Sequence, residues 1–344
     1  MKSYFNYFFV LLLWVYKNII LFLFGYLLCL ICGVELIVII LLNLVIIAFY
    51  VVFERKLLAA IQRRRGPNII GFWGLLQSIA DGLKLMLKEV LIPYKANYNI
   101  FVLAPIISFT ITLLILSSLP VSSFSFFNVL NTDVDILIYF ALSSLSIYGV
   151  LLSGWSSNSK YAFLGGLRSA AQMISYEIFF SLVLLIIIFM SKSANILDIV
   201  NKQQIVWYIV PCFPIAIIFF IALLAETNRT PFDLPEAEAE IIAGYNIEYS
   251  SMLFALFFLS EYGNMFALSY LFTLFFLGGW LGPFNCTLPF GFWAVAKTII
   301  IATNFIIIRA NIPRYRYDQL MALGWKIFLP FVFSWFLFVI SLLI

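Results

Sequence analysis

The densest group of ionisable residues in this chain is acidic and lies between two apolar segments. Only 10% of the 344 residues are charged, yet one short stretch holds Glu226, Asp233, Glu236, Glu238 and Glu240. Carboxylates packed this closely repel one another when ionised, so some are expected to have a raised pKa and to titrate as a coupled set. Pro231 and Pro235 disfavour a regular helix there and favour a fixed turn. The pattern is typical of proton exchange, and a solvated acidic loop is the alternative interpretation.

Further ionisable residues interrupt the apolar segments themselves. Glu177 and Glu261 lie well inside such segments, where charged groups are costly and usually functional. For each, the alternative is a carboxylate hydrogen-bonded between helices for packing alone. Glu54, Glu226 and Arg168 lie near segment ends, from which a side chain can reach the membrane interface. Nine residues separate Arg168 from Glu177, which places them on opposite sides of an ideal helix and about 13 Å apart along its axis. The two are not expected to pair, so Glu177 is a candidate proton-relay residue.

Composition determines the elements that must position these groups. Hydrophobic residues make up 64% of the chain, and the mean hydropathy is +1.09. A soluble globule would need far more polar surface, so the chain is predicted to be an integral membrane protein. The apolar runs lack the alternation of barrel strands, and backbone groups in lipid must be satisfied internally. The predicted fold class is therefore all-α, a polytopic helical bundle.

Windows of about nineteen residues predict eight transmembrane helices in a single membrane domain over residues 31–344. The predicted spans lie near residues 31–53, 98–120, 136–158, 162–190, 206–226, 250–277, 291–310 and 324–343. Residues 1–30 are predicted to be an apolar extension at the membrane surface. A ninth span there would bury Lys17 at a cost of roughly 2.5–3.5 kcal/mol.

The charges of the connecting loops predict the orientation of the chain. Residues 55–97 contain eight Lys and Arg, whereas the opposite loops contain only Lys192 and Lys202. Positive loops stay on the cytoplasm-like face, so both termini are expected on the far face. Residues 72–90 carry apolar side chains at helical spacing with polar ones opposite, which predicts an amphipathic helix lying in the interface.

Several classes of chemistry have no matching motif. The chain has no His and four Cys, and the Cys29/Cys32 pair lies in an apolar run without a second pair. Small buried thiols are the favoured interpretation, and no metal site is expected. Gly165-Gly166 follows no predicted strand, so no phosphate-binding loop is expected. The net charge of +4 is concentrated on one membrane face, which indicates topology and docking and gives no support for nucleic-acid binding.

Five segments resemble one known family in sequence and in order. They are FERKLLAAIQRRRGPN (53–68), GLLQSIADGLKLMLKE (74–89), SNSKYAFLGGLRSAAQMISYE (157–177), AETNRTPFDLPEAEAEIIAGYNIEYS (225–250) and RYRYDQLMALGWK (314–326). The chain from about residue 30 onward is similar to subunit 1 of NADH:ubiquinone oxidoreductase, the membrane subunit of respiratory complex I at the joint between its two arms. Residues 1–30 depart from the pattern, and the role of that extension stays open.

The resemblance implies specific roles. The positive-side loops would dock against the peripheral-arm subunits that carry the quinone site and the terminal iron–sulfur cluster, with small membrane-arm subunits and lipid as further neighbours. This chain would bind no cofactor itself: ubiquinone would be the substrate of the complex, and NADH, FMN and iron–sulfur clusters would belong to partner subunits. The tunnel for ubiquinone would be lined or braced by Glu54, Arg55, Asp81 and Arg168. The proton pathway would contain Glu177, Glu226, Asp233, Glu236, Glu238, Glu240 and Glu261.

Two other functions are compatible with such a bundle. A stand-alone ion-coupled transporter could use Glu177 and Glu261 to bind a cation, but it should show repeated halves and broken helices, and neither is visible. The membrane subunit of a proton-pumping hydrogenase is the other alternative, against which the complete quinone-family motifs argue. The 38 Phe residues and the lack of His suggest the coding bias of many mitochondrial genomes. The mitochondrial inner membrane is therefore favoured over a bacterial plasma membrane.

Overall fold

The computed structural model describes residues 38, 40–120, 133–233, 244–282 and 290–343. The chain divides into two units, Met1–Leu42 and Asn43–Ile344. Almost all of the first unit, including the predicted extension over residues 1–30, lies outside the described residues. The description below concerns the second unit. A domain boundary near residue 31 stays a prediction.

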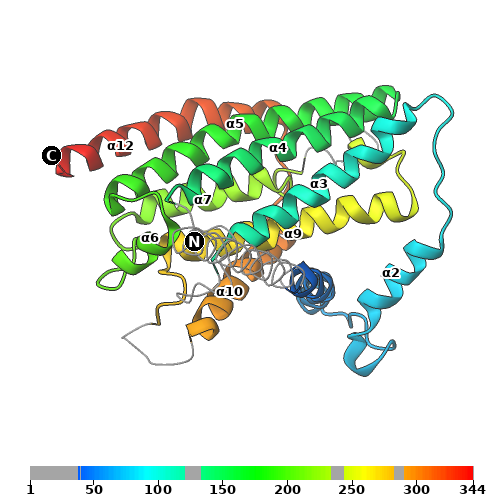
Figure 1. Cartoon of the computed structure of the whole chain (residues 1–344), viewed down its shortest axis with the longest axis horizontal. Helices are drawn as coiled ribbons and strands as arrows, with labels where there is room; N and C mark the ends of the chain where they lie inside the picture. Colours follow the sequence, from blue (N-terminus) through cyan, green and yellow to red (C-terminus); the bar gives the residue numbers. More distant parts are fainter. Residues whose placement is uncertain (1–37, 39, 121–132, 234–243, 283–289, 344) are drawn as a thin grey trace, which may run out of the picture. The chain divides into compact units, whose positions relative to one another are not determined.

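The described part of the chain contains helices and turns and no strand, so the all-α fold class is confirmed. Helices α3 (Tyr98–Ser118), α4 (Asp135–Ser156) and α5 (Lys160–Ser191) pack in chain order as neighbours. Figure 1 shows α12 (Leu329–Leu343) running alongside α5. Behind this row, α9 (Ser251–Phe276) contacts α3, α7 (Phe213–Glu226) and α10 (Phe290–Asn311). The result is a bundle in which α5, α7 and α9 share the core.

Six described helices are long and apolar enough to cross a membrane. They are Tyr98–Ser118, Asp135–Ser156, Lys160–Ser191, Ser251–Phe276, Gly291–Asn311 and Tyr317–Leu342. The last combines α11 (Tyr317–Ala322), a π-helical turn (Leu323–Phe328) and α12. A further helix runs through residues 43–61. It overlaps the second half of the span predicted over residues 31–53, and the start of that span lies outside the described residues. The chain is therefore a multi-pass membrane protein.

One predicted span is shorter in the structure. The sequence predicts a crossing over residues 206–226, but α7 has 14 residues and is about 21 Å long, less than the roughly 30 Å of a hydrocarbon core. Residues 203–212 form turns instead. Pro211 cannot donate a backbone hydrogen bond and Pro214 lies in the first turn of α7, so the helix begins only at Phe213.

The predicted amphipathic helix is also shorter than residues 72–90. A single 3-10 turn (Phe72–Gly74) precedes α2 (Gln77–Leu87). Positive φ angles at Gly71, Trp73 and Gly74 interrupt the helical path, and Lys88 has an extended backbone at the other end. Residues on the apolar face of α2, including Ile79, Leu83 and Met86, are exposed. This open apolar face agrees with a location in the membrane interface.

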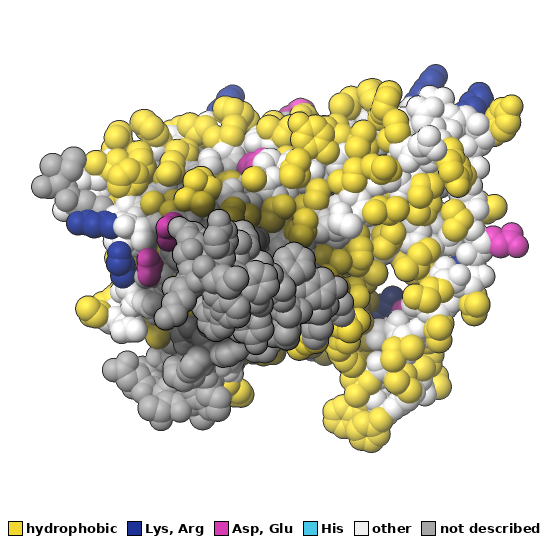
Figure 2. Space-filling model, in the orientation of Figure 1, with side chains coloured by type: hydrophobic (Ala, Val, Ile, Leu, Met, Phe, Trp, Pro, Cys, Tyr) yellow, Lys and Arg dark blue, Asp and Glu magenta, His cyan; other side chains and the backbone are white. Residues whose placement is uncertain are grey.

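Close approach of backbones fixes two contacts of α5. A Cβ on Gly154 of α4 would lie 3.2 Å from the Cα of Gly166 on α5, and a Cβ on Gly165 would lie 2.8 Å from the Cα of Gly244. The absence of these Cβ atoms lets α4 pack on one side of α5 and the 3-10 turn η3 (Gly244–Asn246) on another. In Figure 2, hydrophobic side chains cover most of the visible face over α3–α5, and Lys and Arg lie at its edges.

Candidate functional site

Four charged side chains from four elements meet inside the bundle. Glu54 lies near the end of the helix 43–61, Arg309 near the end of α10, Arg229 just after α7, and Glu261 in α9. Arg309 Nη1 donates a hydrogen bond to Glu54 Oε1. Arg229 Nη1 lies 3.8 Å from Glu54 Oε1, and Arg229 Nη2 lies 3.8 Å from Glu261 Oε2. Arg229 thus stands between the two carboxylates.

The position of Arg229 follows from how α7 ends. Asn228 adopts a left-handed conformation with a φ of 50°, and this turns the chain away from the helix axis. The Arg229 side chain is only 7% exposed. Its guanidinium carbon lies 4.7 Å from the centre of the Tyr262 ring, close enough for a cation–π contact.

Glu261 has a second contact on its other side. The hydroxyl of Tyr245, on η3, donates a hydrogen bond of 2.9 Å to Glu261 Oε1. The segment that carries Tyr245 is held by Tyr249, whose ring stacks on Phe101 at 4.0 Å between centroids. Burial raises the pKa of Tyr249 to about 12, so its hydroxyl, 3.3 Å from Ser156 Oγ, keeps its proton at neutral pH.

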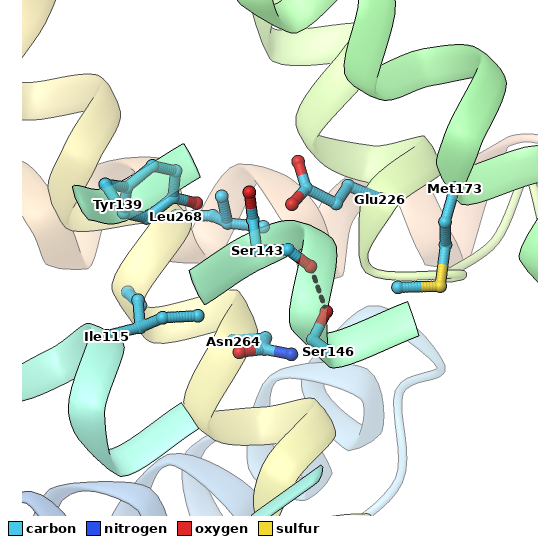
Figure 3. A pocket seen from close by; sticks show the side chains of 9 residues that line it. Ile115, Tyr139, Ser143, Ser146, Met173, Glu226, Asn264 and Leu268 are labelled. Atoms are coloured by element: carbon cyan, nitrogen blue, oxygen red, sulfur yellow. Dashed lines mark hydrogen bonds between the residues drawn. The ribbon is translucent and has the colours of Figure 1, made fainter. Parts of the chain in front are cut away.

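Two narrow pockets lead from Glu261 to Glu226 and beyond. The first has a cavity volume of about 30 Å³, and its lining includes Glu261, Glu226, Ser146 and Asn264. The second has a cavity volume of about 10 Å³, and its lining includes Glu226, Asn264, Tyr139 and Ser143. Figure 3 shows the Glu226 carboxylate at the end of α7 pointing toward Ser143 on α4. Polar side chains therefore line the space on both sides of Glu226.

Glu177 follows Ser143 on the outer side of the bundle. Ser143 Oγ lies 3.4 Å from Glu177 Oε1, within reach of a weak hydrogen bond. Glu177 also lines an open groove of about 640 Å³ between α4 and α5, together with Phe140, Ser144 and Ile174. Within the described residues, neither Glu177 nor Glu226 has an Arg or Lys within ion-pair distance.

Asp233, at the edge of the described acidic segment, is 3% exposed and lies 3.3 Å from Arg314. The amide of Gln172 on α5 holds the backbone there by donating to the carbonyls of Ala225 at 2.7 Å and Phe232 at 2.9 Å. The remaining predicted acids of this segment, Glu236, Glu238 and Glu240, lie outside the described residues.

The other predicted tunnel residues lie at the surface of the described chain. Arg55 Nη1 and Asp81 Oδ2 are 2.6 Å apart, an ion pair that joins the helix 43–61 to α2. Gln77 adds a hydrogen bond of 2.8 Å to Asp81. Arg168 on α5 lies 5.9 Å from the ring of Tyr317 on α11.

The predicted carboxylates fall into two groups, those with an arginine nearby and those without one, and residue type alone does not indicate which is which. Glu54, Asp81, Asp233 and Glu261 each have an arginine nearby, whereas Glu177 and Glu226 are surrounded by hydroxyl, amide and apolar groups. The predicted repulsion concerns the acidic segment, of which the structure describes Asp233 beside Arg314, and repulsion among the remaining acids of that segment stays a prediction. Arg229, Arg309 and Tyr245 are not among the predicted site residues. In the sequence, Arg229 follows the predicted span 206–226 and Arg309 lies at the end of the span 291–310, and neither position alone indicates a site.

The fold and these contacts define a multi-pass helical membrane protein with a network of ionisable groups inside its bundle. A family model described as NADH dehydrogenase matches residues 34–340. A Chondrus crispus protein named NADH-ubiquinone oxidoreductase chain 1 is 53% identical over 312 residues, covering 90% of this chain and 95% of that protein. The Arabidopsis thaliana protein of the same name is 52% identical over 83% of this chain and 88% of its own length. A Paramagnetospirillum magneticum protein, named as a subunit of NADH-quinone oxidoreductase, is 48% identical over 91% of this chain and 92% of its own length.

The chain belongs to the NADH dehydrogenase family of membrane subunits that includes these algal, plant and bacterial proteins. The resemblance found in the sequence motifs is thereby confirmed, as is the assignment of the chain to an enzyme complex. Family membership also favours this assignment over a stand-alone transporter.

Proposed function

We propose that this chain forms the ubiquinone access tunnel and the start of the proton pathway in an NADH:ubiquinone oxidoreductase. The observation that carries the proposal is the line of polar groups from Glu54 through Arg229, Glu261 and Glu226 to Glu177. At one end of this line, Glu54 lies near the C-terminal end of the helix 43–61. At the other end, Glu177 lines the open groove between α4 and α5.

The tunnel is assigned to the end of the line near Glu54. Arg55 and Asp81 join the helix 43–61 to α2, whose exposed apolar face suits an isoprenoid tail. Arg168 braces α5 against α11 through Tyr317. In this proposal a quinone head that enters beside α2 meets Glu54 and Arg309, and a change of its charge alters the electrostatic balance of that pair.

The proton pathway is assigned to the remaining acids. Glu261 and Glu226 line one pocket, Glu226 and Ser143 line the next, and Ser143 contacts Glu177. Hydroxyl and amide groups at these positions can orient water molecules between the carboxylates. Asp233, Glu236, Glu238 and Glu240 are proposed to supply further exchangeable protons on the positive side of the membrane.

The proposal extends to partners and location. The quinone-site and terminal iron–sulfur subunits of the peripheral arm are assigned to the positive-side loops. Small membrane-arm subunits are assigned to the groove beside Glu177, because a half-buried carboxylate facing lipid alone would be costly. NADH, FMN and the clusters are assigned to partner subunits, ubiquinone is the substrate of the complex, and the location is the mitochondrial inner membrane.

The test is Glu226→Gln in membranes that contain the assembled complex. The variant keeps the shape of the side chain and removes its exchangeable proton, so quinone-linked turnover and proton pumping are expected to fall by about 100-fold, the lower end of the range for a lost proton-transfer group. Oxidation of NADH by an artificial acceptor should stay unchanged.

Asp198→Asn is the control, since Asp198 is an exposed carboxylate in α6 (Ile196–Lys202), outside the positive-side loops to which partner subunits are assigned. Full pumping and turnover in the Glu226 variant would overturn the proposed pathway. Equal loss of the artificial-acceptor activity would assign the defect to assembly and count against a role in proton transfer.

A further inference from the structure

We propose that Arg229 is a positioning residue that couples the charge of Glu54 to the charge of Glu261, its guanidinium being shared between the two carboxylates. The inference rests on the proposed function, since it assigns Glu54 to the tunnel end and Glu261 to the proton pathway. It adds the link by which a change at one of them is transmitted to the other.

The geometry of the shared guanidinium carries the proposal. Arg229 uses two different nitrogen atoms, Nη1 toward Glu54 and Nη2 toward Glu261, and both distances are 3.8 Å. At this length neither contact is a full hydrogen bond, so a shift of less than about 1 Å toward one carboxylate would complete one bond and weaken the other. A planar guanidinium carries several N–H groups in a fixed arrangement and can contact two carboxylates at once. A lysine ammonium is a compact charge and would contact one of them at a time.

Burial strengthens the electrostatic interaction of Arg229 with the two carboxylates. The side chains of Arg229 and Glu54 are 7% and 5% exposed, and that of Glu261 is 16% exposed. Water screens charges poorly at such positions, so each carboxylate is sensitive to where the guanidinium lies. A positive neighbour favours the charged form of the carboxylate that it approaches.

The surroundings permit a small movement of Arg229. The Tyr262 ring, 4.7 Å from the guanidinium carbon, offers a flat face along which the planar group can slide without losing its cation–π contact. Arg229 also lines a small cavity of about 10 Å³ with Glu54, Tyr50 and Met265, which leaves room for a small displacement only.

Each carboxylate has a further partner that remains when Arg229 shifts. Glu54 keeps the hydrogen bond from Arg309, and Glu261 keeps the one from Tyr245. A change of charge beside Glu54 would therefore shift Arg229 toward or away from Glu261 and alter the electrostatic environment of Glu261. A change of charge beside Glu261 would shift the guanidinium in the opposite direction.

The experiment compares Arg229→Lys, Arg229→Gln, Glu261→Gln and the double variant Arg229→Gln/Glu261→Gln in the assembled complex. Arg229→Lys keeps the positive charge and removes the two-pronged guanidinium that contacts both carboxylates. The variant should retain artificial-acceptor activity and at least half of the quinone turnover. The number of protons pumped per NADH should fall by half or more, a change that a merely structural role would not produce. The exposed Lys192→Gln, directly after α5 and outside the positive-side loops, is the control for loss of a positive charge.

The double variant tests whether Arg229 acts through Glu261. Arg229→Gln leaves a buried carboxylate without its shared cation, and we expect a loss of quinone turnover of about tenfold. Glu261→Gln alone already removes the carboxylate through which Arg229 is proposed to act, so the double variant should be no slower than Glu261→Gln alone. A wild-type pumping ratio in Arg229→Lys, or losses that multiply in the double variant, would overturn the coupling role.

These failures are distinguishable from failure of the proposed function. If Glu226→Gln slows pumping while Arg229→Lys pumps normally, the pathway stands and only the coupling by Arg229 falls. If Glu226→Gln has no effect, the pathway itself falls.

Discussion

The hydroxyl of Ser143 lies in the Glu226 pocket and within hydrogen-bond reach of the Glu177 carboxylate. Its Oγ also donates to the carbonyl of Phe140 at 3.0 Å, within its own helix. Because one hydroxyl hydrogen cannot serve both acceptors fully, Ser143 can alternate between them. That exchange is the property expected of a group that passes protons between two acids.

Ser143→Ala should slow quinone-linked proton pumping several-fold and change the free energy of unfolding by only about 1 kcal/mol, the usual net value of one hydrogen bond. Ser334→Ala is the matched control, because Ser334 on α12 makes the same kind of bond, 2.8 Å to the carbonyl of Phe331, at an exposed position. Pumping rates of the two variants, each normalised to artificial-acceptor activity, provide the measurement. Equal rates would remove Ser143 from the pathway.

At the same scale, the sequence could predict which residues are ionisable but not which would be paired. Glu54 and Arg309 are separated by 255 positions and meet only because the helix 43–61 packs near α10. Arg229 follows directly after α7, yet its partners come from two other helices. Hydrophobic pattern determines that these helices form, whereas their mutual rotation determines which charges face each other.

The sequence predicts the helix bounds well where the length of an apolar run alone determines where a helix begins and ends. Helices α3, α4, α5 and α9 have bounds within a few residues of the expected spans. The pattern failed at α7, where Pro211 and Pro214 delay the helix start, and at α2, where Gly71 and Gly74 interrupt the path. Lys297 on α10 was also missed: it is buried, and its Nζ donates to the carbonyls of Leu277, Gly279 and Leu281.

Gly165 on α5 lets the turn η3 pack closely against that helix, because glycine has no Cβ atom. Gly165→Ala would place a Cβ 2.8 Å from the Cα of Gly244, which is backbone and cannot rotate away. The turn would have to shift, and Tyr245 with it, so the hydrogen bond to Glu261 should be weakened. We expect a loss of about 1–3 kcal/mol in stability, typical of overpacking, together with a several-fold loss of quinone turnover per assembled complex.

Gly82→Ala is the control for Gly165→Ala, because a Cβ on Gly82 of α2 meets nothing within 4 Å. That substitution should leave activity unchanged and stabilise α2 by about 0.5–1 kcal/mol. Thermal inactivation and quinone turnover of both variants test the comparison. A Gly165 variant as active and stable as the Gly82 variant would show that η3 tolerates the displacement.

At the scale of the whole molecule, charge asymmetry and helix packing predict one orientation. The Lys- and Arg-rich segment 55–97 covers the end of the helix 43–61 and its connection to α3, whereas Lys192 and Lys202 follow α5, the second at the end of α6 (Ile196–Lys202). Helices α3, α4 and α5 are consecutive and packed against one another, and each is long enough to cross. Three crossings therefore separate residue 65 from residue 204, which places these two exposed positions on opposite membrane faces.

Single cysteines at these positions, Arg65→Cys and Gln204→Cys, should react with a membrane-impermeant thiol reagent from opposite sides of sealed vesicles. The Arg65 variant is expected to be labelled on the side that carries the peripheral arm, since the positive loops are proposed to dock there. The unsubstituted chain gives the background from its four cysteines, and the same reagent after detergent lysis gives the full reaction of each variant. Labelling of both positions from one side would require an even number of crossings between them. Because α3, α4 and α5 supply three, that result would contradict the topology on which the tunnel and the acidic segment are assigned to the same face.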